Sequence, residues 1–224
     1  MADARTDRLV WIDCEMTGLD PVHDEIVEIA VIVTDAELNE LDGGVSVVVR
    51  PADLSILERM DDVVVRMHTE SGLLVDIPNG IPLAEAGRIV MEYVTGHVPE
   101  MRRAPLAGSS VYVDRGFLAR YLPELDAHLH YRLVDVSTIK ELARRWYPRA
   151  YFNAPVKTGG HRALADTRES IAELRYYRDT LFVAGPGPSA NEARSAAANH
   201  VVDHSTARCT AGHGVDASTA EEPS

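Results

Sequence analysis

The sequence predicts a single α/β domain built on a mixed sheet. Three segments with strand character, residues 9–12, 25–35 and 45–50, follow one another closely, so residues 8–50 predict an antiparallel meander. Two shorter strand-like segments, 105–110 and 131–136, then alternate with helical segments. Three antiparallel strands followed by strands that alternate with helices are typical of a mixed sheet with helices on its faces.

The helices are predicted by apolar residues that recur every three or four positions. In residues 83–97, for example, these positions fall on one face of a helix. We expect Pro123 to end the helix before it, and Ser137 to cap the helix that begins at Thr138. The other predicted helices cover residues 54–60, 61–68, 114–122, 138–146 and 162–182.

Length and composition fit one domain of ordinary globular type. The chain has 224 residues, of which 46% are hydrophobic and 25% are charged. From Val183 onward the sequence changes to Gly, Pro, Ala, Ser, Thr and His with few large apolar residues. We therefore expect a folded domain over residues 1–182 and a disordered, low-complexity tail over 183–224, to which we assign no function.

The expected location follows from the same composition. No run of 18 apolar residues occurs, and the N-terminal residues lack the apolar stretch of a secretory signal. The two cysteines, Cys14 and Cys209, predict neither a disulfide framework nor a zinc site. We expect a cytoplasmic protein with no membrane partner.

The net charge of −13 narrows the range of nucleic-acid partners. A protein that grips long duplex nucleic acid needs a basic surface for the phosphates, which this composition disfavours. A metal-dependent enzyme that acts on a short anionic substrate is compatible with the charge, because bound divalent cations supply positive charge locally.

Two carboxylates, Asp13 and Glu15, stand out at the end of the first strand. Residues two apart in a strand project from the same face about 6.5–7 Å apart, so these side chains lie together. Neighbouring carboxylates at the end of an apolar strand repel one another and lose hydration, which favours a cation between them. Oxygen ligands of this type suit Mg²⁺ or Mn²⁺. Taken alone, the pair is also compatible with a solvated strand end that leads into a turn.

Three more polar residues lie where other elements begin. Asp114 opens a predicted helix, where a carboxylate can simply be a capping group. Asp166 lies in the first turn of the last helix, with His161 five residues before it, so the two converge only if His161 precedes the helix. The pair Gly159-Gly160 allows that path, and otherwise His161 is a surface residue.

Together these motifs resemble the DEDDh 3′-to-5′ exonucleases, a family with a ribonuclease H-like fold. The resemblance covers about residues 8–182 and is most specific toward the branch that acts on very short RNA. The motifs of that branch are similar to residues 11–21, 68–73, 131–146 and 168–178 of this chain.

The resemblance implies a metal-dependent exonuclease that releases 5′-mononucleotides from the 3′ end of very short RNA, including dinucleotides. The four carboxylates would bind two divalent ions, Mg²⁺ or Mn²⁺. These ligands are Asp13, Glu15, Asp114 and Asp166. His161 would act as the general base on the attacking water, a task that suits imidazole because it exchanges protons near neutral pH.

The same resemblance implies a set of substrate contacts. Leu19 would separate the two terminal bases, His68 would contact the 3′ end, and a ring of donors around the 5′ phosphate would favour dinucleotides. Tyr131 would come from a second subunit, which implies a homodimer. The residues expected to bind substrate are Leu19, His68, Ser110, Tyr131, Arg132, Ser137 and Thr138. Without the resemblance, Arg132 would be a surface ion pair and Ser137 a helix cap.

Two alternatives share the fold. One is a proofreading-type DNA exonuclease, which the net charge and the expected 5′-phosphate contacts disfavour. The other is a catalytically silent nucleic-acid-binding module, which the retention of all four carboxylates and His161 disfavours. The chain departs from the family pattern at positions that are not metal ligands, namely Val63, Ser109, Tyr112 and Ala165.

Overall fold

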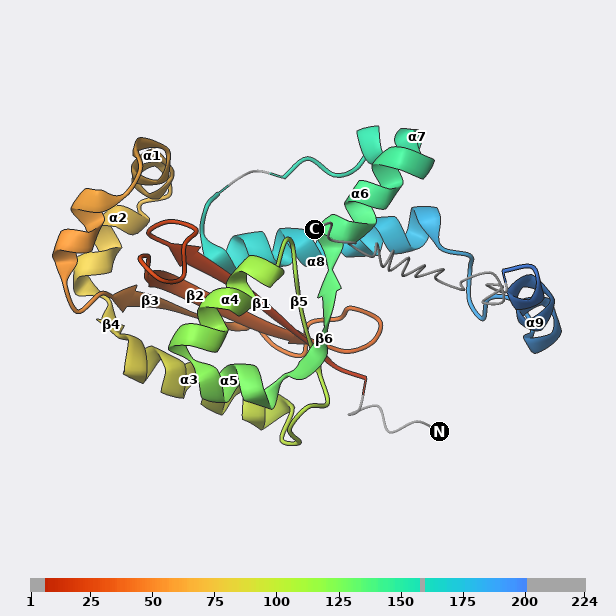
Figure 1. Ribbon diagram of the computed structural model, residues 1–224, viewed down its shortest axis with the longest axis horizontal. Helices are drawn as coiled ribbons and strands as arrows, with labels where there is room; N and C mark the ends of the chain where they lie inside the picture. Colours follow the sequence, from red (N-terminus) through yellow and green to blue (C-terminus); the bar gives the residue numbers. More distant parts are fainter. Residues whose placement is uncertain (1–6, 158–159, 201–224) are drawn as a thin grey trace, which may run out of the picture. The chain divides into compact units, whose positions relative to one another are not determined.

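This computed structural model describes residues 7–157 and 160–200. A mixed sheet of six strands forms the centre of the domain that precedes Val183 (Figure 1). The strands are β1 (Leu9–Met16), β2 (Ile26–Thr34), β3 (Val45–Arg50), β4 (Ile81–Pro82), β5 (Pro105–Gly108) and β6 (His130–Asp135). Their order in the sheet is β4-β3-β2-β1-β5-β6. Strands β1, β2 and β3 pair antiparallel, whereas β1, β5 and β6 run parallel. The predicted fold class is confirmed.

Helices cover both faces of this sheet (Figure 1). They are α1 (Asp62–Glu70), α2 (Leu73–Asp76), α3 (Leu83–His97), α4 (Tyr112–Tyr121), α5 (Pro123–His128), α6 (Val136–Trp146), α7 (Pro148–Phe152) and α8 (Ala163–Leu181). Two short 3-10 helices, η1 (Leu54–Arg59) and η2 (Ile77–Asn79), complete the domain. Helices α3, α4 and α5 pack on one face, and α6 and α8 pack on the other.

A hydrophobic core lies on each face of the sheet. The first joins Val10 of β1 to Val90 of α3 and Phe117 of α4. The second joins Trp11 of β1 to α6 and to Tyr177 of α8. Strand β2 is buried at every position because it lies between β1 and β3 and is covered on both faces. This double burial explains its nearly continuous apolar sequence.

Several local features differ from the prediction. Strand β4, which pairs with β3, and helix α7 form in stretches outside the predicted strands and helices. As predicted, the helix before Pro123 ends there, because α4 ends at Tyr121 with Leu122 as its C-cap. Pro123 is also the first residue of α5, which was not predicted, and its missing N–H leaves no helical bond unmade there. Ser137 is not the cap of α6. Asp135 is the cap, and its Oδ1 accepts a hydrogen bond from the Ser137 backbone N at 2.8 Å.

The chain divides after Phe182 into two units, residues 1–182 and 183–224. The second unit contains α9 (Ala190–Ala198), so the expected disorder does not hold there. The helix starts with a capping box in which Ser189 Oγ accepts from the Glu192 backbone N and Glu192 accepts from the Ser189 backbone N. This run is rich in Ala, which favours helix even without an apolar face. Residues 201–224 of the predicted tail lie outside the described residues.

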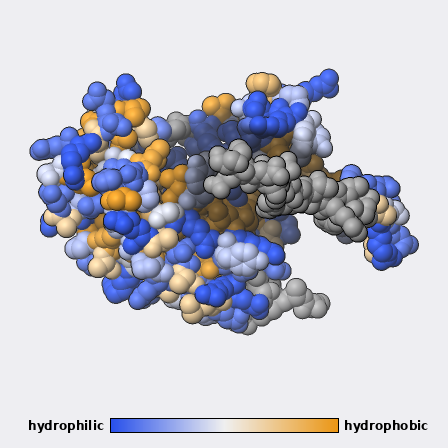
Figure 2. All heavy atoms as spheres, viewed as in Figure 1, coloured by the Kyte–Doolittle hydropathy of each residue, from blue (hydrophilic) through white to orange (hydrophobic). Residues whose placement is uncertain are grey.

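Hydrophilic and apolar residues are interspersed on the face shown in Figure 2, where small apolar groups are surrounded by hydrophilic ones. Among residues 7–157 and 160–200, no helix has both the length and the apolar character that crossing a bilayer requires.

The hydrogen bond of Trp11 provides a test of this packing. Trp11 is fully buried, and its Nε1 donates to Thr34 Oγ1 at 3.0 Å, which links β1 to β2. Replacing Thr34 by Val keeps the shape but leaves the indole N–H unpaired, so we expect the free energy of unfolding to fall by about 1–3 kcal/mol. Urea denaturation measures this loss. Thr34→Ser keeps the hydroxyl and should lose less, and equal losses in both variants would contradict the interpretation.

Candidate active site

Three carboxylates converge where the end of β1 meets the start of α8. Asp13 and Glu15 follow Trp11 on the face of β1 that α8 covers, because alternate residues of a strand share a face. Asp166 lies in the first turn of α8. One oxygen from each of Asp13, Glu15 and Asp166 lies within 4.8 Å of the others. This donor set fits a divalent cation, whose charge offsets the repulsion between the carboxylates.

Asp114 approaches the same strand end from α4. The helix begins at Tyr112, two residues earlier than predicted, so Asp114 lies in its first turn. Asp114 is 6% exposed, and its Oδ1 accepts a hydrogen bond from the backbone N of Cys14 at 2.9 Å. Because Cys14 lies between Asp13 and Glu15, this bond holds Asp114 against the strand end. Asp114 is adjacent to the group of three carboxylates but does not belong to it.

Burial and mutual repulsion make the charged forms of these acids costly. Burial raises the pKa of Asp13 well above its usual range, and the negative charges of the other three carboxylates raise it further. Burial also raises the pKa of Glu15 to about 7, with a contribution from Asp166. The pKa of Asp114 rises to about 7, again because of burial, although the Cys14 N–H opposes the rise. A bound cation would favour the charged forms, so metal binding and ionisation support each other.

His161 precedes α8, which begins at Ala163 and carries Asp166 in its first turn. Burial raises the pKa of Asp166, and the nearby His161 opposes that rise. The imidazole is half-buried. The His161 backbone has a φ of +44°, in the left-handed region that is costly for a residue with a side chain. Gly160 precedes it, whereas Gly159 lies outside the described residues.

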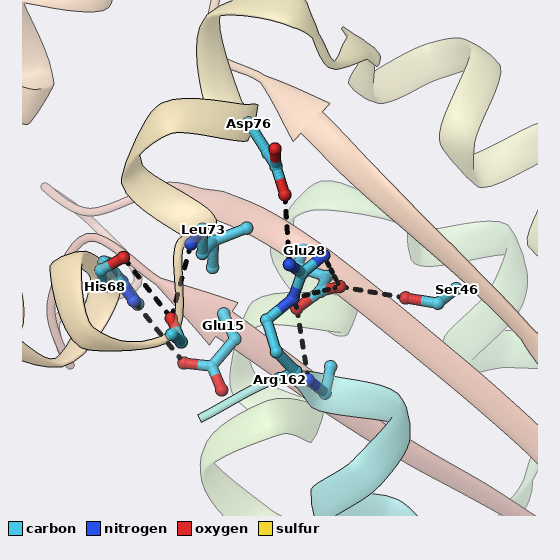
Figure 3. A network of polar contacts seen from close by, with 9 residues as sticks. Glu15, Glu28, Ser46, His68, Leu73, Asp76 and Arg162 are labelled. Atoms are coloured by element: carbon cyan, nitrogen blue, oxygen red, sulfur yellow. Dashed lines mark hydrogen bonds and ion pairs between the residues drawn. The ribbon is translucent and has the colours of Figure 1, made fainter. Parts of the chain in front are cut away.

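His68 of α1 is buried against the end of β1 (Figure 3). Its Nε2 lies 2.9 Å from the backbone O of Met16. A carbonyl can only accept, so the proton of this bond belongs to Nε2. The other ring nitrogen, Nδ1, lies 3.8 Å from Glu15 Oε2 and has no hydrogen-bond partner among the described residues. His68 therefore lies next to a carboxylate of the cluster.

Leu19 is presented to solvent by the turn after β1, where it is 76% exposed. Asp24 holds this turn by accepting hydrogen bonds from Thr17 Oγ1 at 3.0 Å and from the Asp20 backbone N at 2.9 Å. A Cβ at Gly18 would lie 2.4 Å from Asp24 Oδ2, so glycine leaves room for the carboxylate that holds the turn. An apolar side chain is thus exposed in the turn that follows the acidic end of β1.

Ser110 and Ser137 come together at the end of β6. Asp135 brings them there, because its Oδ1 accepts hydrogen bonds from the backbone N of Ser110 at 3.0 Å and of Ser137 at 2.8 Å. The Ser110 hydroxyl donates to the Ser137 hydroxyl at 3.0 Å. Thr138 follows in the first turn of α6. Hydroxyl groups from two segments therefore share one small area.

Tyr131 and Arg132 lie nearer the start of β6, which is an edge strand of the sheet. Tyr131 is 72% exposed. The guanidinium carbon of Arg132 lies 5.6 Å from the centre of the Tyr131 ring, and Arg132 lines a hollow together with Arg8 and His130. The structure thus groups Ser110 with Ser137 and places Arg132 in a separate hollow.

Sequence reasoning missed the ion pair between buried Glu28 and partly exposed Arg162 (Figure 3). Glu28 of β2 lies opposite Glu15 in the β1–β2 register, and its side chain is 2% exposed. Arg162 donates hydrogen bonds to both oxygens of this carboxylate. A signal for the pair is present in the sequence: Glu28 is the single charged residue in the apolar run 26–33, and a buried carboxylate needs a partner.

Sequence reasoning also missed a second buried acid, Glu173 of α8. It lies 3.1 Å from Lys140 of α6 and 3.2 Å from Lys157 in the segment before α8. The positive charge of Lys157 also opposes the rise that burial causes in the pKa of Asp13. Glu173 therefore holds a cation close to the acidic cluster.

Comparison with known proteins places this geometry in context. A family model described as "Exonuclease" (RNase_T) matches residues 10–174. An oligoribonuclease from Leifsonia xyli subsp. xyli is 60% identical over 203 residues, which cover 91% of this chain and 97% of that relative. An oligoribonuclease from Streptomyces avermitilis is 60% identical over 196 residues, which cover 88% of this chain and 98% of the relative.

Solved structures of exonuclease I, which has a ribonuclease H-like fold, share this architecture. The enzyme from Methylocaldum szegediense matches with a TM-score of 0.57 at 24% identity. The zinc-bound complex of E. coli exonuclease I with single-stranded DNA matches with a TM-score of 0.61 at 15% identity. Each match covers 78% of this chain and 41% of the exonuclease I chain. The chain thus spans about two fifths of these structures, and the likeness concerns the fold.

The raised pKa values predict how the metal-free chain responds to pH. The pKa values of Glu15 and Asp114 are about 7 in the folded chain, against usual values of 4.5 and 3.8. Between the usual pKa values and about 7, the folded state therefore binds more protons than the unfolded state does. The stability that these bound protons contribute is lost as the pH rises through about 7. From pH 5 to pH 8 in EDTA, we expect the free energy of unfolding to fall by on the order of 5 kcal/mol for the two groups together, measured by urea denaturation.

Mg²⁺ or Mn²⁺ should remove much of this fall, because a bound cation stabilises the charged carboxylates. Glu15→Gln, which cannot ionise, should also flatten the profile. Glu92→Gln, on an exposed part of α3, is the matched control and should leave the profile unchanged. A metal-free chain whose stability stays constant or increases over this range would contradict the interpretation.

Proposed function

The chain belongs to the oligoribonuclease family of exonucleases, and from this premise we propose that it is a 3′-to-5′ exoribonuclease that hydrolyses very short RNA to 5′-mononucleotides. The observation that carries the proposal is the convergence of Asp13, Glu15 and Asp166, with His161 just before the helix that carries Asp166. Alignment with the relatives over nearly their whole length supports it, because the site lies within the aligned region.

In this proposal four carboxylates hold two divalent ions, Mg²⁺ or Mn²⁺. They are Asp13, Glu15, Asp114 and Asp166. When bound, such ions supply positive charge that activates water and stabilises the leaving oxygen. His161 accepts the proton of the attacking water as general base. Its place just before α8, from which its charge acts on Asp166, supports this role, because the proton acceptor must lie near the site where water is activated.

Side chains around the cluster bind the two ends of a short RNA. Leu19 separates the terminal bases, a role supported by its exposure in a turn that Asp24 holds. His68 lies at the 3′ end of the substrate, a role supported by its Nδ1, which lies 3.8 Å from Glu15 of the acidic cluster. Leu19 follows the end of β1, and His68 contacts the Met16 carbonyl there. Both residues are therefore near the proposed site of the reacting phosphate.

The opposite end of the substrate, the 5′ phosphate, is bound by a group of donors. The hydroxyls of Ser110, Ser137 and Thr138 lie at the end of β6 and the start of α6, where they can donate to phosphate oxygens. Arg132 is exposed, which leaves its guanidinium able to turn from the Tyr131 ring toward the phosphate. A closed group of donors favours dinucleotides, because a longer strand has no path beyond it.

The working enzyme is a homodimer in this proposal, with Tyr131 reaching the site of the second subunit. The exposure of Tyr131 on an edge strand supports this arrangement, because the residue is accessible to another chain. We place the protein in the cytoplasm on the basis of its composition.

A length series tests the proposal. With Mg²⁺ or Mn²⁺, we expect release of 5′-mononucleotides from 5′-labelled RNAs of two to seven residues, with the highest rate on the dinucleotide. Asp13→Ala should lower kcat by roughly a thousandfold, about 4 kcal/mol, because it removes a metal ligand. Product formation is followed by gel electrophoresis, and Glu92→Gln is the control that should keep the rate of the unmodified chain.

The same assay separates the alternatives. Equal rates on all lengths would refute the closed 5′-phosphate contact. Faster hydrolysis of a matched DNA series would favour the proofreading-type DNA exonuclease, which has the same fold. A folded chain with no activity on either series would favour the silent binding module.

Removal of the second unit tests whether the domain before it is sufficient. A chain truncated after Phe182 retains every residue of the proposed site, so we expect its rate on the dinucleotide to stay within about tenfold, or 1.4 kcal/mol, of the full chain. A larger loss at unchanged stability would show that residues 183–224 contribute to function.

A further inference from the structure

Arg162 lies between His161 and the first residue of α8, and its guanidinium joins three segments of the chain (Figure 3). Nε lies 3.2 Å from both oxygens of Glu28, and Nη2 donates to Glu28 Oε1 at 3.0 Å. Nη1 donates to Asp76 at the end of α2 at 3.0 Å. The residue after His161 is therefore fixed to both β2 and α2.

The Glu28 carboxylate is fully engaged by these contacts. Besides Arg162, its oxygens accept hydrogen bonds from Ser46 Oγ at 3.0 Å and from the Ala163 backbone N at 3.1 Å. Ala163 is the first residue of α8, so one buried carboxylate sets both the start of the helix and the position of Arg162. A planar guanidinium that binds a carboxylate through more than one N–H is held in a defined orientation.

His161 needs such support because its backbone is strained. Its φ of +44° lies in a region that a residue with a side chain occupies only when the surrounding structure imposes it. On the C-terminal side, the Arg162 carbonyl accepts the hydrogen bonds that begin α8, from the backbone N of Ala165 and Asp166. The side chain and the carbonyl of Arg162 together hold the residue that follows the strained position.

We propose that Arg162, paired with buried Glu28, is a positioning residue that holds His161 beside the Asp13, Glu15 and Asp166 cluster. The inference rests on the proposed function, since it assigns His161 the role of general base. Arg162 acts through His161 and does not contact the reacting atoms. Its loss should therefore affect the rate of the chemical step more than the binding of substrate.

The most informative variant is Arg162→Lys, because it keeps a positive charge beside Glu28 but loses the planar fork. We expect kcat on an RNA dinucleotide to fall at least tenfold, while KM and the affinity for Mn²⁺, measured by calorimetry, each change less than threefold. Glu28→Gln keeps the size of the side chain and should reproduce this pattern. It also preserves the test if Arg162→Lys folds poorly, which thermal unfolding will show.

A double-mutant cycle with His161→Ala tests whether the effect passes through His161. In the His161→Ala background, Arg162→Lys should lower kcat less than twofold, because the group that it positions is already absent. The matched control is Arg168→Ala. Arg168 ties the same helix to the β2–β3 connection through Glu40 and the Gly43 carbonyl, away from the cluster, and its replacement should leave kcat within twofold.

Several outcomes would overturn the inference: an unchanged kcat in Arg162→Lys, an equal loss in Arg168→Ala, or a tenfold loss that persists in the His161→Ala background. A loss seen only in KM or in Mn²⁺ affinity would also overturn it. These results differ from failure of the proposed function, in which the unmodified chain itself would show no hydrolysis of short RNA.

Discussion

Repulsion among buried carboxylates at the end of β1 is the constraint on which the site depends. Asp13 and Glu15 share one face of the strand, and α8 adds Asp166 to the same space. Burial and the neighbouring charges raise the pKa of each of these acids. Lys157 offsets only part of this effect on Asp13. The charged carboxylates therefore destabilise the metal-free folded chain, and they also provide ligands suited to a divalent cation.

The direction of the strands explains why separate segments meet at this point. Strands β1, β5 and β6 run parallel, so their carboxyl ends lie along the same edge of the sheet. Strand β1 ends in the residues around Glu15, β5 leads into α4 and Asp114, and β6 leads into α6 and Ser137. Three chain segments that are distant in sequence thus deliver polar side chains to one edge.

Glu28 is a buried acid whose carboxylate is satisfied by partners within the protein. It faces Glu15 across the β1–β2 pair, but Arg162, Ser46 and a backbone N–H occupy its oxygens. Removing Arg162 would leave the buried Glu28 charge uncompensated and destabilise the folded chain. Neighbouring strands therefore carry one acid that the protein satisfies internally and one that remains available to a metal ion.

Local patterns in the sequence determined the antiparallel meander, the positions of most helices and the pairing of Asp13 with Glu15 on one face. These features follow from periods of two and 3.6 residues, which depend on nearest neighbours along the chain. Periodicity does not report contacts between distant segments. The tertiary structure alone decided that Arg162 binds Glu28 across 134 positions, that Asp135 rather than Ser137 caps α6, and that β4 pairs with β3. Each of these depends on which surfaces pack together and in what register, and that choice is made by the whole chain when it folds.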